Sequence, residues 1–309
     1  MKDLVKDLLR VGRFAPVESY QRLAYGCAAL LVFSGAFHGV VYLVEGGAWG
    51  GPISWRKPIV FGLSFGITLA TLTWFMTFIR PRRAVGWIVL GLFAFASLGE
   101  VFLISMQTWR GVASHFNEET AFDGTVFGLM GALVSVIALV TLFVAVRSFF
   151  HVEAPASLAW ALRLGLVLML VSQAVGVQMI VQGGNTFGVA GDAKIAHAVT
   201  LHAVQVLPAL ALVLLLSNYR EASRLSIVLL GAMGYVGLIA STMVQMFTGR
   251  GPLDLVVTAS ALGLLGLGLL GASAFFALRG LGSRGLHAGS PLVDGQPREA
   301  VAEPPSVHS

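Results

Sequence analysis

The chain has 309 residues, of which 56% are hydrophobic and only 11% are charged, and its net charge is +5. A soluble domain carries roughly 25% charged residues, and the mean hydropathy here is +0.83. These values exclude a soluble enzyme, a disordered scaffold, a secreted disulfide-bonded module and a DNA-binding domain. The single cysteine, Cys27, excludes a disulfide framework and a thiolate metal cluster.

The N-terminal segment, residues 1–22, combines an apolar and a basic helical face. Leu4, Val5, Leu8 and Val11 share the apolar face. Four basic residues surround it: Lys2, Lys6, Arg10 and Arg13. This pattern predicts a cytoplasmic amphipathic helix that lies in the membrane interface. A frayed leader is the alternative.

Eight apolar runs follow, each close to the roughly 20 residues that cross a bilayer as a helix. They predict an all-α, polytopic membrane bundle of eight transmembrane helices. The runs are 23–44, 58–79, 84–107, 125–146, 160–181, 198–216, 225–247 and 253–278. No small-residue cleavage site accompanies the first run, so we expect a retained helix and not a signal peptide.

The distribution of basic residues predicts the orientation of the bundle. An even number of spans places both termini on one side of the membrane. Fifteen of the twenty Lys and Arg residues then share that side with the termini. The positive-inside rule predicts that this side is cytoplasmic, and we expect the cell (inner or plasma) membrane as the location.

Two halves of the chain resemble each other, which predicts a tandem repeat of four helices in residues 23–146 and 147–279. Tyr42–Gly47 resembles Met179–Gly184 at an offset of 137, and Met106–Gly111 resembles Met246–Gly251 at an offset of 140. Chance matches between glycines are the alternative. Because each half has an even number of spans, both halves share one orientation, related by an axis along the membrane normal.

The last segment, residues 280–309, is rich in Gly, Pro, Ser and Glu and lacks periodicity. It predicts a disordered cytoplasmic tail.

Polar residues inside the spans concentrate in the outer halves of the helices, whereas the inner halves are almost entirely Leu, Val, Ala, Phe and Gly. A polar lining on one side predicts an outward-facing chamber with a dry floor. A channel or carrier would need favourable sites along the whole path. We therefore expect a membrane-embedded site that is reached from the outer side.

Three of these residues come from three different helices and are candidate metal ligands: His38, Glu100 and His202. Imidazole and carboxylate suit Zn, Fe, Cu or Mn, so the expected cofactor is a metal or a haem, with His38, His202 and Gln205 as cofactor-binding residues. The alternative is that each histidine is hydrogen-bonded and structural, because no metal-binding motif accompanies them.

Glu100 and His115 are the candidate catalytic residues. A carboxyl group in hydrocarbon is expensive and defaults to a functional hypothesis. His115 lies in an outer loop, residues 108–120, that also carries Ser114 and Glu118 and is longer than its counterpart after Arg250. The alternatives are a structural ion pair for Glu100 and an ordinary solvated loop.

Outer basic residues suggest a second kind of site. Lys57 is matched by Lys194 and Arg110 by Arg250 at the repeat offsets, while Arg56 has no partner. A basic vestibule of this kind attracts a small anion. The alternative is that nearby acidic residues neutralise these cations.

The length, the eight spans and the parallel four-plus-four duplication resemble the architecture of haem A synthases. That family requires histidines on the even-numbered helices of each half. Here only His197 and His202, on the sixth span, occupy a comparable place. The family's Glu–His–Arg motif is absent, so the resemblance extends to architecture and implies no activity.

Three functions remain open from the sequence. The first is an outward-facing site for a metal, a haem, or a small or lipidic substrate. The second is a transporter or receptor for a small anion, and the third is a structural or assembly subunit of a membrane complex. The expected partners are the lipid bilayer and a small-molecule or lipid ligand, without nucleic acid.

Overall fold

The computed structural model describes residues 6, 12–16 and 18–287. This part of the chain contains eight helical segments long and apolar enough to cross a membrane, so the predicted number of spans and the helical class are confirmed. The spans are α2 (Ser19–Glu45), α3 (Arg56–Ile79), α4 (Arg83–Trp109), α5 (Ala121–Phe150), α6 (Ala156–Gln182), α7 (Ala193–Leu201) with α8 (Ala203–Leu215), α9 (Glu221–Phe247) and α10 (Val257–His287). Two short antiparallel strands, β1 (Thr186–Phe187) and β2 (Gly191–Asp192), lie between α6 and α7.

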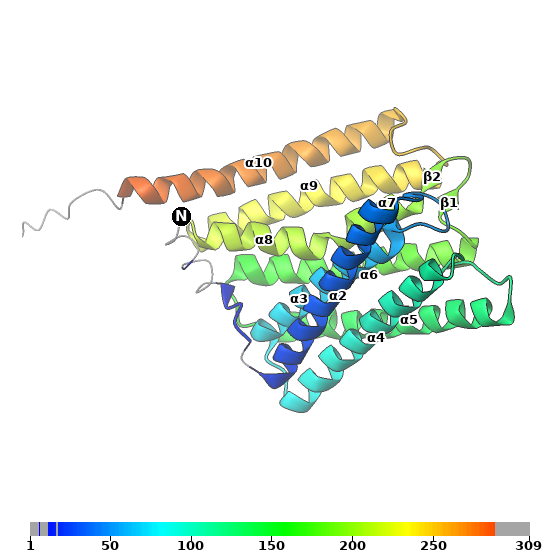
Figure 1. Cartoon of the computed structure of the whole chain (residues 1–309). Helices are drawn as coiled ribbons and strands as arrows, with labels where there is room; N and C mark the ends of the chain where they lie inside the picture. The colour runs from blue at the N-terminus through cyan, green and yellow to red at the C-terminus, as the bar shows by residue number, and fades with distance from the viewer. Residues whose placement is uncertain (1–5, 7–11, 17, 288–309) are drawn as a thin grey trace, which may run out of the picture.

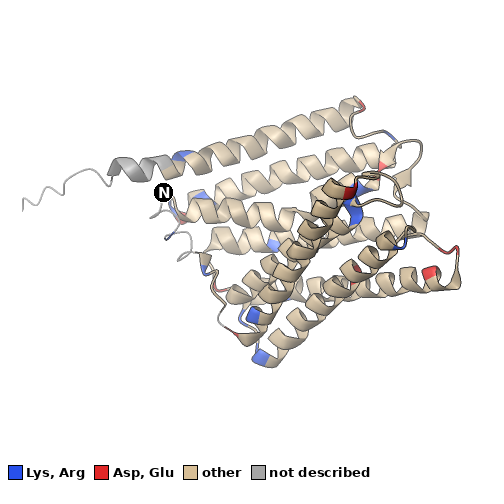
Figure 2. Ribbon diagram, in the orientation of Figure 1, with Lys and Arg blue, Asp and Glu red and all other residues tan. Residues whose placement is uncertain are grey.

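The two ends of the bundle differ in the length of their connections. Residues 46–55, 110–120, 183–192 and 248–256 connect the helices at one end, which we name the long-loop end. Short connections at 80–82, 151–155 and 216–220 define the short-loop end. The long-loop end lies at the right of Figure 1, and charged residues gather mainly at the helix ends (Figure 2).

Two predicted terminal segments are only partly covered. Half of residues 1–22 lies outside the described residues, namely 1–5, 7–11 and 17, as does 288–309 of the predicted tail. The helix α10, however, continues to His287, so the predicted tail begins later than residue 280. Extending an existing helix costs far less than nucleating one, which explains why glycine-containing sequence still continues it.

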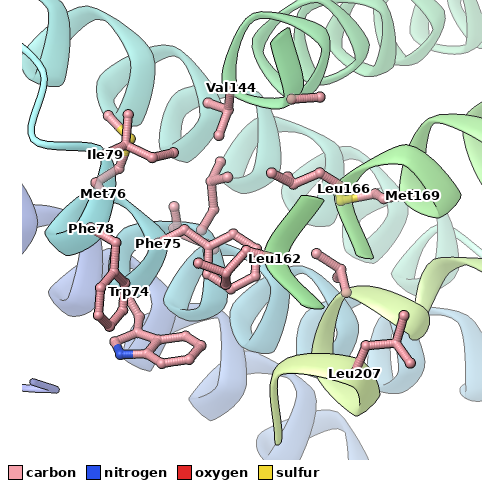
Figure 3. Packing of buried hydrophobic residues seen from close by; sticks show 14 of the residues in the cluster. Trp74, Phe75, Met76, Phe78, Ile79, Val144, Leu162, Leu166, Met169 and Leu207 are labelled. Atoms are coloured by element: carbon pink, nitrogen blue, oxygen red, sulfur yellow. The ribbon is translucent and has the colours of Figure 1, made fainter. Parts of the chain in front are cut away.

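Figure 3 shows part of the largest apolar cluster, many of whose members come from the helix halves nearer the short-loop end. Trp74, Phe75 and Phe78 from α3 lie in this cluster together with Leu162 and Leu166 from α6. All five side chains are at most 6% exposed. The predicted dry floor therefore corresponds to a packed aromatic and aliphatic layer.

This layer is less purely apolar than the sequence suggests. Thr73 and Thr141 are fully buried there, and each hydroxyl donates to the carbonyl oxygen four residues earlier. Gln21 donates to Thr77 Oγ1 at 3.0 Å. Such local bonds satisfy the hydroxyl groups inside the helix, so they add no ionisable site to the layer.

Close helix crossings depend on glycine. A Cβ atom at Gly62 of α3 would lie 2.7 Å from the backbone nitrogen of Gly35 and 2.9 Å from the carbonyl oxygen of Leu31, both in α2. In membranes, small residues allow such backbone approach, which is a main source of helix association. The α2–α3 pair is thereby positioned tightly, and it carries Lys57 at the long-loop end of α3.

The helix contacts of residues 19–150 and 156–287 are similar, although α10 also contacts α8. In the first half, α3 packs on α2 and α4, α2 packs on α4, and α4 packs on α5. In the second half, the broken helix α7–α8 packs on α6 and α9, α6 packs on α9, and α9 packs on α10. The halves meet where α5 packs on α6 and where α3 contacts α8.

Candidate functional site

Glu100 is an ionisable side chain in the interior of the bundle. It lies on α4, roughly 13 Å along the helix from Trp109, and is 1% exposed. Its Oε2 atom has no hydrogen-bond partner among the described residues, and neither has Ser97 Oγ one turn earlier on the same helix. A buried polar atom without a partner is costly and suggests a functional position.

The structure brings the two candidate catalytic residues together. His115 Nε2 lies 3.9 Å from Glu100 Oε1. The imidazole ring lies among three phenylalanine rings, those of Phe61, Phe116 and Phe127. His115 therefore lies over the buried carboxyl group and does not point freely into solvent.

His115 also contacts its neighbour Ser114. The Ser114 Oγ to His115 Nδ1 distance is 2.9 Å, and Ser114 is 1% exposed. Burial, followed by the nearby charge of Lys57, lowers the pKa of His115 from 6.5 to about 3. The imidazole is therefore neutral at pH 7, with one ring nitrogen that donates and one that accepts.

The loop that carries these residues is held in a demanding conformation. Phe116 has a φ angle of +55°, in the left-handed region that bulky side chains rarely adopt. Asn117 is buried and donates to the carbonyl oxygen of Ala113 at 2.9 Å, while its Oδ1 accepts from the backbone of Glu119. This folded-back loop sets the orientation of Ser114 and His115.

A second group of polar residues fastens both ends of the loop. Asp123 in the first turn of α5 accepts from Gln107 at 2.9 Å and forms an ion pair with Arg110 at 2.7 Å. Thr120 caps α5 and also donates to Asp123. Asp123 thus neutralises Arg110, one of the four cations expected in the anion site.

Lys57 lies in the first turn of α3, with Nζ 3.5 Å from Ser114 Oγ. Arg56 and Lys194 lie near enough to repel its charge. No carboxylate oxygen within the described part of the chain reaches salt-bridge distance of Lys57. Lys194, in contrast, lies 3.5 Å from Asp192.

Arg250 occupies a separate place. It lines an open recess at the long-loop end together with Thr248, Asp254, Leu255 and Val256. The four basic residues of the expected anion site therefore divide into the neighbouring Lys57 and Lys194, the neutralised Arg110, and Arg250 at this recess.

His38, a candidate metal ligand, is engaged at both ring nitrogens. Trp109 Nε1 donates to His38 Nε2 at 3.1 Å, and His38 Nδ1 lies 2.8 Å from the carbonyl oxygen of Ser34. Trp55 packs against both rings. With both nitrogens occupied, His38 has no free lone pair to offer a metal.

His202 marks a break in the sixth span. It ends α7 and begins α8, six residues before Pro208. Proline lacks an N–H donor and its ring clashes with the carbonyl oxygen four residues earlier, that of Val204, which explains a break in this region.

The side chain of His202 joins a short chain of contacts. Its Nδ1 lies 3.3 Å from Gln205 Oε1, and Gln205 in turn donates to Thr68 Oγ1 of α3 at 3.3 Å. This chain links the two halves of the protein. His197 is held separately, by the carbonyl oxygen and hydroxyl of Ser172.

The predicted metal ligands are not assembled. The residues that the structure describes include no group of three or more His, Cys, Asp or Glu side chains that could hold a metal ion. The metal or haem site of His38, Glu100 and His202 stays a prediction without a ligand set in the structure.

Two participants were absent from the candidate residues: Ser114 and Thr68. Ser114 directly precedes His115 in the chain, so adjacency was an available signal for it. Thr68 stands at an offset of 137 from Gln205, the repeat offset itself.

Comparison with protein-family models, with curated proteins and with solved structures finds no match.

Proposed function

We propose that this protein is a multi-pass membrane protein that binds a small anionic ligand at its long-loop end. The ligand lies against Lys57 and Lys194, beside the acid–base pair of Glu100 and His115. The observation that carries this proposal is the uncompensated charge of Lys57, which has two cationic neighbours and no carboxylate partner in the described structure. Such a group gains most from an incoming anion.

Helix geometry supports the same ligand class. Lys57 and Lys194 each lie in the first turn of a helix, α3 and α7. The N-terminus of a helix carries partial positive charge, which adds to that of the lysines. An oxyanion or the anionic headgroup of a lipid has the matching chemistry.

The test is thermal stabilisation of the purified protein by phosphate, sulfate and acetate. A ligand at a hundred times its dissociation constant stabilises by about 2.7 kcal/mol, and we expect Lys57→Met to abolish the effect. Arg250→Met is the matched control, because Arg250 is a cation at the same end without a contact to Lys57. Nanodiscs of phosphatidylglycerol and of phosphatidylcholine separate a lipid headgroup from a free anion.

Two results would contradict the proposal. One is an absence of stabilisation by every soluble anion and by the anionic lipid. The other is a stabilisation that Lys57→Met leaves intact.

The proposal also includes the tandem repeat of four helices. Gly66 approaches the carbonyl oxygen of Ala28, and Gly165 approaches that of Ala203. These two crossings are related by the offset of 137. Thr68 and Gln205, and Lys57 and Lys194, are also related by 137 and lie near each other. Near a two-fold axis each residue lies close to its own equivalent, so these pairs support a pseudo-two-fold axis between α3 and the broken helix α7–α8.

The proposal includes the orientation of the protein in the membrane. We infer that the long-loop end faces outward from the plasma membrane and that both termini are cytoplasmic, because basic residues concentrate at the short-loop end. The predicted metal or haem cofactor has weaker support, since His38 is fully engaged. An absorption spectrum and elemental analysis of the purified protein test it directly, and co-purification of a stoichiometric subunit would favour an assembly role.

A further inference from the structure

Four polar side chains form a row from the long-loop end to the interior of α4. Lys57 Nζ lies 3.5 Å from Ser114 Oγ, and Ser114 Oγ lies 2.9 Å from His115 Nδ1. His115 Nε2 lies 3.9 Å from Glu100 Oε1. Each member can donate to the next one inward, and both Ser114 and Glu100 are buried.

We propose that this row is a proton path that connects Glu100 with the aqueous phase at the long-loop end alone. The path goes beyond anion binding and does not depend on it. Its role is to load and unload a proton on a carboxyl group that lies inside the membrane-spanning bundle.

The transfer moves one proton along the row toward Glu100. Initially Glu100 is ionised, His115 carries its proton on Nε2, and Lys57 is an ammonium. The Nε2 proton passes to Glu100, the Ser114 hydroxyl proton passes to His115 Nδ1, and a Lys57 proton passes to Ser114 Oγ. Glu100 is now neutral, Ser114 is again an alcohol, and His115 has exchanged tautomers. The neutral Lys57 amine then takes a proton from water.

The burial of His115 agrees with this order. The lowered pKa of His115 means that the ring stays neutral, so it relays by exchanging tautomers and not by forming an imidazolium ion. The gap between His115 and Glu100 exceeds an ordinary hydrogen bond by about 1 Å. A small approach of the loop to α4, or one bridging water, closes it.

No hydrogen bond among the described residues continues the path from Glu100 toward the short-loop end. Leu90, Phe93 and Phe75 are at most 1% exposed in the packed layer on that side. Ser97 is the next polar side chain inward on α4, and its hydroxyl bonds to nothing in the described part of the chain. A proton that reaches Glu100 therefore leaves by the route it entered.

Other charged and titratable groups lie on the helices that pack against α4, which are α2, α3 and α5, and on α7. His38 on α2 is engaged at both nitrogens, and Asp123 on α5 is held by Arg110 and Gln107. On α3 and α7 the nearby charges are Arg56 and Lys194. These groups have partners or stand at the entrance, which leaves Glu100 as the proton acceptor at the inner end.

The repeat offers an internal comparison. At the offset of 140, Ala240 on α9 stands where Glu100 stands on α4. A helix in the equivalent position therefore needs no carboxyl group for packing. This supports a chemical role for Glu100.

Infrared spectroscopy of the full-length protein in nanodiscs tests the path. After a downward pH jump, we expect a protonated carboxyl band that is missing in Glu100→Gln. Ser114→Ala and His115→Phe should slow its appearance by roughly a hundredfold, the lower end of what a positioned proton donor contributes. Phenylalanine suits position 115, which three phenylalanine rings already surround. Ser114→Thr retains the hydroxyl and should restore the rate.

The control is Ser135→Ala, which removes an exposed hydroxyl that donates to the carbonyl oxygen of Gly131 within α5 and should leave the rate unchanged. Equal rates in wild type, Ser114→Ala and His115→Phe would overturn the proposal, as would a Glu100 band that never changes with pH. Proteoliposomes should show no sustained proton flux under a pH gradient. A sustained proton flux that Glu100→Gln abolishes would contradict the inference that the path is closed toward the short-loop end.

Discussion

Ionisable side chains at the long-loop end differ in whether the structure supplies a partner. Asp123 pairs with Arg110, and Asp192 pairs with Lys194. Lys57 has no carboxylate partner in the part that the structure describes, and one oxygen of Glu100 accepts no bond there. The pair of Asp123 and Arg110 accounts for architecture. A ligand or a proton changes the local energy most at the groups that lack such a partner among the described residues, which are Lys57 and Glu100.

Asp123 provides a test of the architectural group. It accepts from Gln107, Arg110 and Thr120 and thereby fastens both ends of the loop that carries His115. Asp123→Asn replaces one acceptor oxygen by an NH2 group that faces the donors of Gln107, Arg110 and Thr120, so we expect a lower unfolding temperature. Thermal unfolding in detergent measures it. Glu119→Gln, an exposed change in the same loop, is the control, and equal melting of the two variants would refute the role.

Helix crossings determine how precisely the site is built. Because α2 and α3 approach through glycine, the long-loop end of α3 has little freedom to move, and Lys57 is placed beside the loop that carries Ser114. On the other side, the break at His202 brings Gln205 to Thr68. Backbone contact and one interrupted helix thus bring together residues that lie far apart in sequence.

Gly62→Ala tests the crossing of α2 and α3. The added Cβ would meet backbone atoms of Gly35 and Leu31, which cannot rotate away. We expect a loss of about 1–3 kcal/mol from overpacking. Gly91→Ala on α4 is the matched control, since a Cβ there meets nothing within 4 Å, and alanine favours a helix over glycine by about 1 kcal/mol. A Gly62→Ala protein at least as stable as Gly91→Ala would show that the crossing is not tight.

The whole molecule is polarised along its helices. Glu100, His115 and Lys57 lie toward the long-loop end, and many members of the largest apolar cluster come from the helix halves nearer the other end. This asymmetry favours a site that is open to one side of the membrane only. The charge bias of the connections supports the proposal that this side faces outward.

Cysteine accessibility tests the orientation. Val189 is 94% exposed in a long loop, and Ala156 is exposed at the short-loop end. In intact cells, a membrane-impermeant maleimide should label Val189→Cys and leave Ala156→Cys unlabelled until the membrane is opened. The parent protein, with Cys27 alone, measures the background. The reverse labelling would place the long loops in the cytoplasm.

The sequence by itself determined the class of the protein and its span count. Crossing a bilayer demands about 20 apolar residues per helix, and that requirement is local, so it is readable without any knowledge of packing. The same holds for the depth of Glu100 along α4, because depth follows from position in the span. For this reason the sequence alone shows that ionisable residues concentrate in one half of the spans and apolar residues in the other half.

Only the tertiary structure decided which polar groups meet. Glu100 and His115 were singled out separately, yet their approach depends on a loop that turns back at Phe116, and the pairing of Arg110 depends on Asp123 in the following helix. His38, Glu100 and His202 share a depth in the sequence but face different partners. Depth is set by distance along one helix, whereas contact also requires rotation and neighbour choice, which arise from packing between helices.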